Sequence, residues 1–164
     1  MIEVNFDKIT QLSKQERYVE VLKQGEALLK DESNLIANLS NITSLLKSSF
    51  DYYLWVGFYI YDNEKNNLVL GPFQGKLACT RIEIGKGVCG TSFKNREAIV
   101  VDDVNKFPGH IFCDSASKSE IVIPIFRNNE VAGVLDVDSA EYSSFDDIDK
   151  KYLTKLSLII SGIL

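Results

Sequence analysis

Apolar residues recur with a helical spacing in two stretches before residue 50. Between residues 13 and 30 they return every three or four positions among lysines and glutamates, and residues 33–50 repeat the pattern behind Ser33 and Asn34, which are typical helix caps. Both stretches predict amphipathic helices that bury one face. We expect them to act as packing scaffold or to contribute to a dimer contact.

From residue 53 the spacing changes to that of β-strands. Residues 53–61 are rich in aromatic and β-branched side chains, and a polar segment separates them from a short apolar return, which predicts a hairpin. Because side chains alternate along a strand, Trp55, Gly57 and Tyr59 share one face, while the opposite face is the expected core side. Two aromatic rings across a glycine indicate a pocket wall, although a helix covering this face explains them equally well.

The second half of the chain predicts a short helix, a short buried strand and a second hairpin. These elements are expected at residues 88–95, at 98–101, and at 119–126 paired with 131–138. A turn-rich loop at 102–109 precedes the only histidine.

The chain closes on a final helix that begins near Ser144 and carries acids in its first turn, as the helix dipole favours. The order of elements predicts a single α+β domain over residues 1–164, with helices in 1–50 and the sheet, cysteine-bearing loops and last helix in 51–164. We expect a mostly antiparallel central sheet flanked by the N-terminal and C-terminal helices.

Composition and charge exclude several classes of function. With 164 residues, 45% of them hydrophobic, the chain can bury a core without a metal or a disulfide. A net charge of −5 disfavours a nucleic-acid partner. The N-terminus lacks a basic segment followed by an apolar run, and no stretch is apolar enough to span a membrane, so we expect no membrane partner and a cytoplasmic location. Structural disulfides are rare there, which leaves the cysteines either inert or engaged in transient redox chemistry.

The three cysteines are Cys79, Cys89 and Cys113, separated by 10 and 24 positions. These spacings exclude a CxxC redox pair and a zinc knuckle. His110 lies three residues before Cys113, and either it or Lys118 is placed to favour a reactive thiolate. Three reduced and unreactive cysteines explain the same pattern equally well.

Two acids stand out on the last predicted strand. Asp136 and Asp138 share a face there and would repel each other unless a cation lies between them. Glu120, at the start of the neighbouring strand, would complete an acidic pocket suited to a ligand ammonium. An exposed face of the sheet is the equally weighted alternative.

Together, the cysteine triplet, Trp55, Tyr59 and the three acids resemble the free methionine-(R)-sulfoxide reductase family of GAF-domain proteins. The phrases at residues 87–90, 110–120 and 133–139 resemble the motifs of that family. The resemblance covers nearly the whole chain after the first helix. Most GAF domains are sensors without the triplet, so the resemblance implies a GAF-like fold and an oxidoreductase.

The resemblance also implies roles for the cysteines. Cys113 is the nucleophile that attacks the sulfoxide sulfur, releasing methionine and leaving a sulfenic acid. Cys79 or Cys89 then resolves it as a disulfide, which thioredoxin reduces at the indirect expense of NADPH. No bound cofactor or metal is implied.

The same resemblance assigns substrate binding to the pocket residues. Glu120, Asp136 and Asp138 hold the ammonium of free methionine sulfoxide, while Trp55 and Tyr59 contact its methyl group. Glu120 or Asp136 protonates the departing oxygen. Two alternatives stay open: a GAF sensor that binds a small ligand without turnover, and a redox-switched interaction protein that needs only the thiols.

Overall fold

The structure is a computed structural model that describes residues 6–111 and 114–163. Its helices, with one 3-10 turn (η1), are α1 (Phe6–Thr10), α2 (Lys14–Leu29), α3 (Leu35–Ser49), α4 (Gly87–Asn95), η1 (Val104–Lys106) and α5 (Asp147–Ser161). Its strands are β1 (Trp55–Asp62), β2 (Asn67–Gln74), β3 (Arg81–Glu83), β4 (Ile99–Val101), β5 (Ser119–Arg127) and β6 (Glu130–Ser139). The elements expected from the sequence are present, while α1, β3 and η1 were not predicted.

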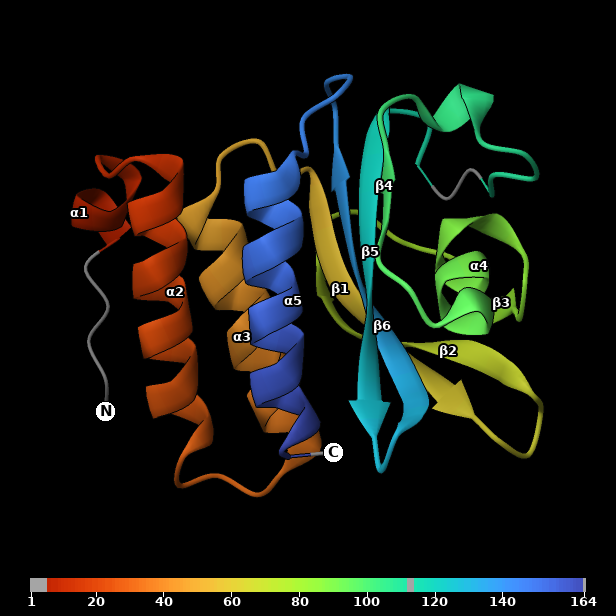
Figure 1. The fold of residues 1–164 in the computed structure, drawn as a ribbon, viewed down its shortest axis with the longest axis horizontal. Coiled ribbons are helices and arrows are strands. Elements are labelled where there is room, and N and C mark those ends of the chain that lie inside the picture. The colour runs from red at the N-terminus through yellow and green to blue at the C-terminus, as the bar shows by residue number, and fades with distance from the viewer. Residues whose placement is uncertain (1–5, 112–113, 164) are drawn as a thin grey trace.

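The six strands form one sheet in the order β3-β2-β1-β6-β5-β4, and every neighbouring pair is antiparallel. Helices α1, α2, α3 and α5 lie on one side of this sheet, and α4 with its flanking loops lies on the other (Figure 1). This arrangement confirms the predicted α+β architecture, in which N-terminal and C-terminal helices flank an antiparallel sheet. The last of the N-terminal helices, α3, ends at Ser49, and the first strand begins at Trp55.

The helices begin where the capping residues indicated. Ser13 and Glu16 form a capping box at the start of α2, and the side chain of Asn34 accepts a hydrogen bond from the Ala37 amide at the start of α3. Asp146 caps α5 through the amides of the first turn. Because these capping interactions join residues only a few positions apart, the sequence was sufficient to predict where the helices lie.

Two strands differ from expectation. β2 continues to Gln74 and so includes Pro72, beyond the short return that was expected. Because β3 pairs only with residues 67–69 of β2, no strand on that side needs a backbone N–H at Pro72. β4 is not the buried strand that was predicted: it lies at the edge of the sheet, and of its three residues only Val101 is buried. An edge strand has one neighbour, so its outer side stays partly open.

Each face of the sheet carries its own apolar cluster. Val56 and Phe58 of β1 belong to the larger cluster, between the sheet and the four helices. Trp55 and Tyr59 belong to the second, beneath α4. The alternation along β1 is therefore confirmed, and its aromatic face is turned toward the side of the sheet that α4 covers.

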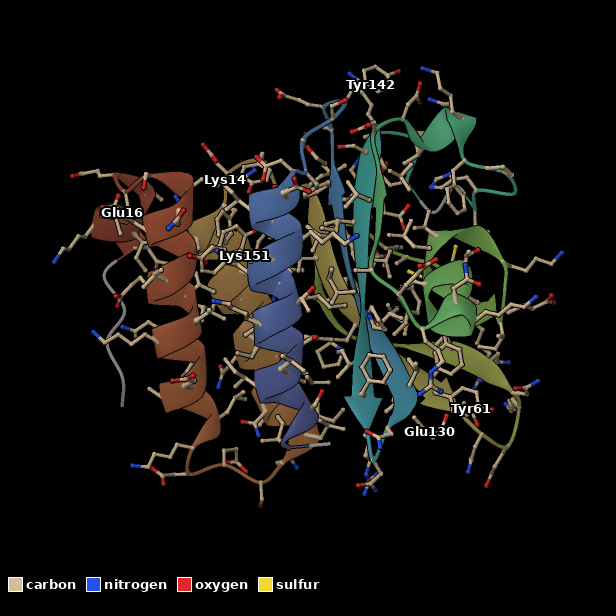
Figure 2. All side chains as sticks on the ribbon, viewed as in Figure 1. Lys14, Glu16, Tyr61, Glu130, Tyr142 and Lys151 are labelled. Atoms are coloured by element: carbon tan, nitrogen blue, oxygen red, sulfur yellow. The ribbon has the colours of Figure 1, made fainter. Side chains whose placement is uncertain are left out.

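A buried polar network holds α5 in the helix layer. The Asp149 carboxylate, which is fully buried, accepts hydrogen bonds of 2.7 Å from both Tyr18 and Tyr52, and Lys14 forms an ion pair with it. The hydroxyls of Tyr18 and Tyr53 are 2.5 Å apart. Figure 2 shows Lys14 beside the first turn of α5. This network joins α2, α5 and the segment entering β1.

Candidate active site

The register of the central strands brings the predicted acids together. Asp138 lies opposite Glu120 on β5 and opposite Trp55 on β1, while Asp136 lies opposite Gly57. Glu120 and Asp136 are only 5% and 7% exposed. The exposed-sheet alternative is therefore wrong for these acids, because the face that bears them lies under α4.

A pocket opens above these strands. It contains about 530 Å³ of empty space, counted together with the open space at its mouth. Its floor is formed by β1, β5 and β6, and its walls by β3, the start of α4 and the loop residues 77–78, 110–111, 114 and 117. Six of the predicted site residues line it: Trp55, Tyr59, Cys89, Glu120, Asp136 and Asp138.

The aromatic wall depends on Gly57. The Trp55 ring is stacked on Phe73 at 5.5 Å between ring centroids and on Tyr59 at 6.1 Å. A Cβ atom at Gly57 would lie 2.4 Å from Cη2 of Trp55, so only glycine lets the indole lie across the strand.

The two rings also anchor the segment that carries Cys79. Trp55 donates its indole N–H to the Lys76 carbonyl at 3.1 Å, and the Tyr59 hydroxyl donates to the Cys79 carbonyl at 3.0 Å. Leu77 and Ala78 of this segment line the pocket. The apolar bodies of the rings thus form the wall, while their polar atoms position the segment around Cys79.

The cysteines are in different states. Cys89, on the first turns of α4, is buried and carries a free thiol, whose pKa is raised well above its usual value by burial and by the neighbouring Asp136 and Glu120. Cys79 is disulfide-bonded. Cys113, the predicted nucleophile, lies outside the described residues. Cys89 is therefore held as a thiol inside the acidic cluster.

Burial dominates the electrostatics of the acids. It raises the pKa of Glu120 and of Asp136 well above their usual values, and the nearby carboxylates raise them further. The pKa of Asp138 rises to about 6, because burial outweighs the hydrogen bond that it accepts from Ser117. Within the described ranges, Oδ1 of Asp136 is buried without a hydrogen-bond partner. Such a cluster favours either retained protons or a bound cation.

His110 occupies a position that the sequence did not indicate. Its Nε2 lies 3.1 Å from Oε2 of Glu120, and both side chains are 7% exposed. Burial lowers the pKa of His110. The sequence placed His110 beside Cys113, and only the fold pairs it with an acid ten residues later.

Lys118, the other predicted helper, lies elsewhere. Its side chain is exposed, and its ammonium lies 5.3 Å from the ring centre of Tyr142, on the loop after β6 (Figure 2). Lys76 and Asp114, which the sequence did not single out, instead form an ion pair of 3.3 Å at the pocket mouth. That pair joins the 75–80 segment to the loop after His110.

Among the described residues, no helix is both long enough and apolar enough to cross a bilayer.

Comparison with known proteins gives consistent results. Residues 32–164 match the GAF domain family. GAF domain-containing protein A of Dictyostelium discoideum is 54% identical over 94% of this chain and 97% of its own length. The free methionine-R-sulfoxide reductase of Saccharomyces cerevisiae is 45% identical over 92% of this chain and 87% of its own. These relatives cover the described site from β1 to β6.

Solved structures agree with this relationship. The X-ray structure of free methionine-R-sulfoxide reductase from Neisseria meningitidis in complex with its substrate superimposes with a TM-score of 0.91. That chain is 45% identical, and the match covers 93% of this chain and 90% of that one.

Proposed function

The chain belongs to the free methionine-R-sulfoxide reductase family of GAF-domain proteins and is an oxidoreductase, and from this premise we propose that it reduces free L-methionine-(R)-sulfoxide to L-methionine with cysteine thiols as the reductant. One observation carries the proposal: the buried carboxyl groups of Glu120 and Asp136 and the half-buried one of Asp138 line a single pocket with two aromatic rings. A free thiol lies inside this cluster, and a disulfide-bonded cysteine follows Ala78 of the pocket wall.

The acids recognise the amino group of the substrate. A free amino acid brings an ammonium, and the carboxylate oxygens of Asp136, Asp138 and Glu120 accept charge-assisted hydrogen bonds from it. Oδ1 of Asp136, which lacks a partner among the described residues, is the first of these acceptors. A methionine within a polypeptide has an uncharged amide nitrogen, so it leaves the buried acids uncompensated and is rejected.

The aromatic wall holds the other end of the substrate. The faces of Trp55 and Tyr59 contact the methyl group, and the stacking of Trp55 on Phe73 keeps the indole in place. The sulfoxide group then lies between these rings and the acids. The preference for the R epimer is supported by the relationship to the free methionine-R-sulfoxide reductases.

The reaction transfers the sulfoxide oxygen to a cysteine. The Cys113 sulfur attacks the sulfoxide sulfur and forms a transient S–S bond. The oxygen then moves to the Cys113 sulfur as the S–S bond and the S–O bond to methionine break, which leaves a sulfenic acid on Cys113 and releases methionine. Methionine sulfur gains two electrons and the cysteine sulfur loses two. Glu120 or Asp136 supplies the proton that the leaving oxygen requires, since burial keeps both carboxyls protonated at higher pH than in water.

A second cysteine then closes the cycle. Attack of its thiol on the sulfenic sulfur forms a disulfide and expels water, and an external dithiol, thioredoxin, reduces that disulfide with electrons from NADPH. We assign the resolving role to Cys79. The assignment is supported by its disulfide and by the state of Cys89, whose buried thiol has a raised pKa and is a poor nucleophile. A homodimer and a cytoplasmic location remain predictions.

A coupled assay tests the proposal. Purified protein is mixed with thioredoxin, thioredoxin reductase and NADPH, and NADPH loss is followed on free L-methionine-R-sulfoxide, its S epimer and the N-acetylated R form. We expect turnover of the free R form alone, abolished by Cys113→Ser and strongly reduced by Asp136→Asn.

The alternatives predict other outcomes. A folded protein that binds the amino acid without consuming NADPH would be a sensor, and this result would refute the reductase. A redox-switched interaction protein would keep its disulfide exchange after Asp136→Asn, because it needs only the thiols. Cys79→Ser and Cys89→Ser in single-turnover assays, with methionine counted per protein, identify the resolving thiol.

A further inference from the structure

Cys89 is the one cysteine among the described residues that the proposed cycle does not use. Its sulfur and one carboxylate oxygen each from Glu120 and Asp136 all lie within 4.8 Å of one another, and all three residues are buried. Asp136 is 7% exposed, and its Oδ1 has no hydrogen-bond partner within the described part of the chain. Three potential ligand atoms therefore border one small space, and the carboxyl group of Asp136 has an oxygen without a partner there.

These three atoms match the preferences of a thiophilic divalent cation. Zn²⁺ binds thiolate sulfur at about 2.3 Å and carboxylate oxygen at about 2.0–2.2 Å, usually with tetrahedral geometry. Ligand atoms of such a site lie roughly 3.5 Å apart, so these side chains reach it by moving about 1 Å. Ca²⁺ and Mg²⁺ need six or more oxygen ligands and gain little from sulfur.

The surroundings support a metal at this position. Nε2 of His110 lies 3.1 Å from Oε2 of Glu120. Carboxylates that bind a metal are commonly oriented by such a hydrogen bond from a residue outside the ligand set. The three ligand residues line the pocket, so its mouth supplies both an entry path and the fourth position, for a water molecule.

We propose that Cys89, Glu120 and Asp136 form a binding site for a thiophilic divalent cation such as Zn²⁺, which competes with the substrate for the acidic end of the pocket. On binding, the Cys89 sulfur releases its proton to solvent and no electrons are transferred. The ligand carboxylates are those that receive the substrate ammonium, so metal and substrate exclude each other. The competition rests on the proposed function, whereas metal binding does not.

Metal binding is tested in a background that leaves Cys89 as the sole thiol, the full-length Cys79→Ser/Cys113→Ser protein. Cd²⁺ is titrated while the sulfur-to-cadmium charge-transfer absorbance is followed, and Zn²⁺ affinity is measured against a chromophoric chelator. We expect one equivalent of Cd²⁺ with a charge-transfer band, no band after adding Cys89→Ser, and at least a tenfold weaker affinity after adding Asp136→Asn instead.

Three outcomes decide the matter. Absence of a stoichiometric band in the folded single-thiol protein overturns the proposal. Equal Zn²⁺ affinity after either added substitution overturns it too, since the cation would then sit elsewhere. A band that survives a large excess of Mg²⁺ supports the thiophilic site.

A second titration separates this inference from the proposed function. Free L-methionine-R-sulfoxide is added to the Cd²⁺-loaded single-thiol protein, and we expect the band to decline as the ligand displaces the metal. If the sulfoxide binds while the Cd²⁺ band stays unchanged, the metal site stands, but the claim that metal and substrate share the same carboxylates is refuted. In the intact enzyme, Zn²⁺ is then expected to raise KM for the sulfoxide without changing kcat.

Discussion

The pocket wall makes a sharp prediction at Gly57, on the face of β1 between Trp55 and Tyr59. In Gly57→Ala the new Cβ would lie 2.4 Å from Cη2 and 2.9 Å from Cζ3 of Trp55, and 2.5 Å from the Cβ of Phe73. Ordinary contacts between carbon atoms are about 3.5–4.0 Å, so a displacement of roughly 1 Å is required. Because Cβ of Phe73 is fixed by β2, the indole ring takes most of that displacement.

The cost follows from what the ring loses. Overpacking a well-packed cluster typically costs about 1–3 kcal/mol, and we expect the free energy of unfolding of Gly57→Ala to fall by that amount. The displaced indole also loses its stacking on Phe73 and its hydrogen bond to the Lys76 carbonyl. A misplacement of about 1 Å at a substrate contact reduces activity by up to about a hundredfold, so we expect kcat/KM to fall roughly ten- to a hundredfold.

Both quantities are measurable with the same protein. Trp55 is the only tryptophan, so its fluorescence reports on the wall directly during urea unfolding, and the coupled assay gives kcat/KM. The matched control is Gly25→Ala in α2, where the new Cβ would meet Leu156 Cδ1 at 3.4 Å and Ile42 Cδ1 at 3.5 Å. It is expected to gain about 0.5–1 kcal/mol and keep full activity. A Gly57→Ala protein with unchanged stability, fluorescence and kcat/KM would refute this description of the wall.

Three further predictions concern single side chains. Tyr59→Phe removes the hydrogen bond to the Cys79 carbonyl, worth about 1 kcal/mol, so single-turnover disulfide formation should slow about fivefold while the protein stays folded; an unchanged rate would contradict the positioning role. Asp149→Ala removes the carboxylate that accepts from the Tyr18 and Tyr52 hydroxyls and pairs with Lys14, which keeps only Asp146. Because hydrogen bonds to a charged group are worth about 1.5–3 kcal/mol each, the substitution should cost about 3–5 kcal/mol in urea unfolding, whereas a loss below about 1 kcal/mol would show the network to be dispensable. Burial opposes ionisation of Asp146, but hydrogen bonds from Lys14 and helix amides outweigh it and lower the pKa of that carboxyl. Its stabilisation is therefore fully present above the unfolded pKa of about 3.9 and is lost as the pH falls through the folded pKa. Asp146→Asn should cost about 0.3–1 kcal/mol at pH 7 and progressively less as the pH falls below about 4. A pH-independent difference would argue against the charge.

Local patterns in the sequence determined much of this protein. Capping residues and apolar spacing placed α2, α3 and α5, because helix ends are stabilised by side chains within a few positions. Strand alternation put Trp55 and Tyr59 on one face, and Asp136 and Asp138 on one face, since that period is a property of the extended backbone. The spacing of the cysteines excluded a local redox pair.

Only the tertiary structure decided how those faces meet. The register that places Glu120 opposite Asp138, the approach of α4 that brings Cys89 to Asp136, and the pairing of His110 with Glu120 all join residues distant in sequence. The same packing decided burial. Strand alternation could not tell whether the acids lie on an exposed or a buried face, and the structure places them in a pocket under α4. Their raised pKa values depend on desolvation and on neighbouring charges, which arise from the surrounding chain and not from any residue's own sequence context.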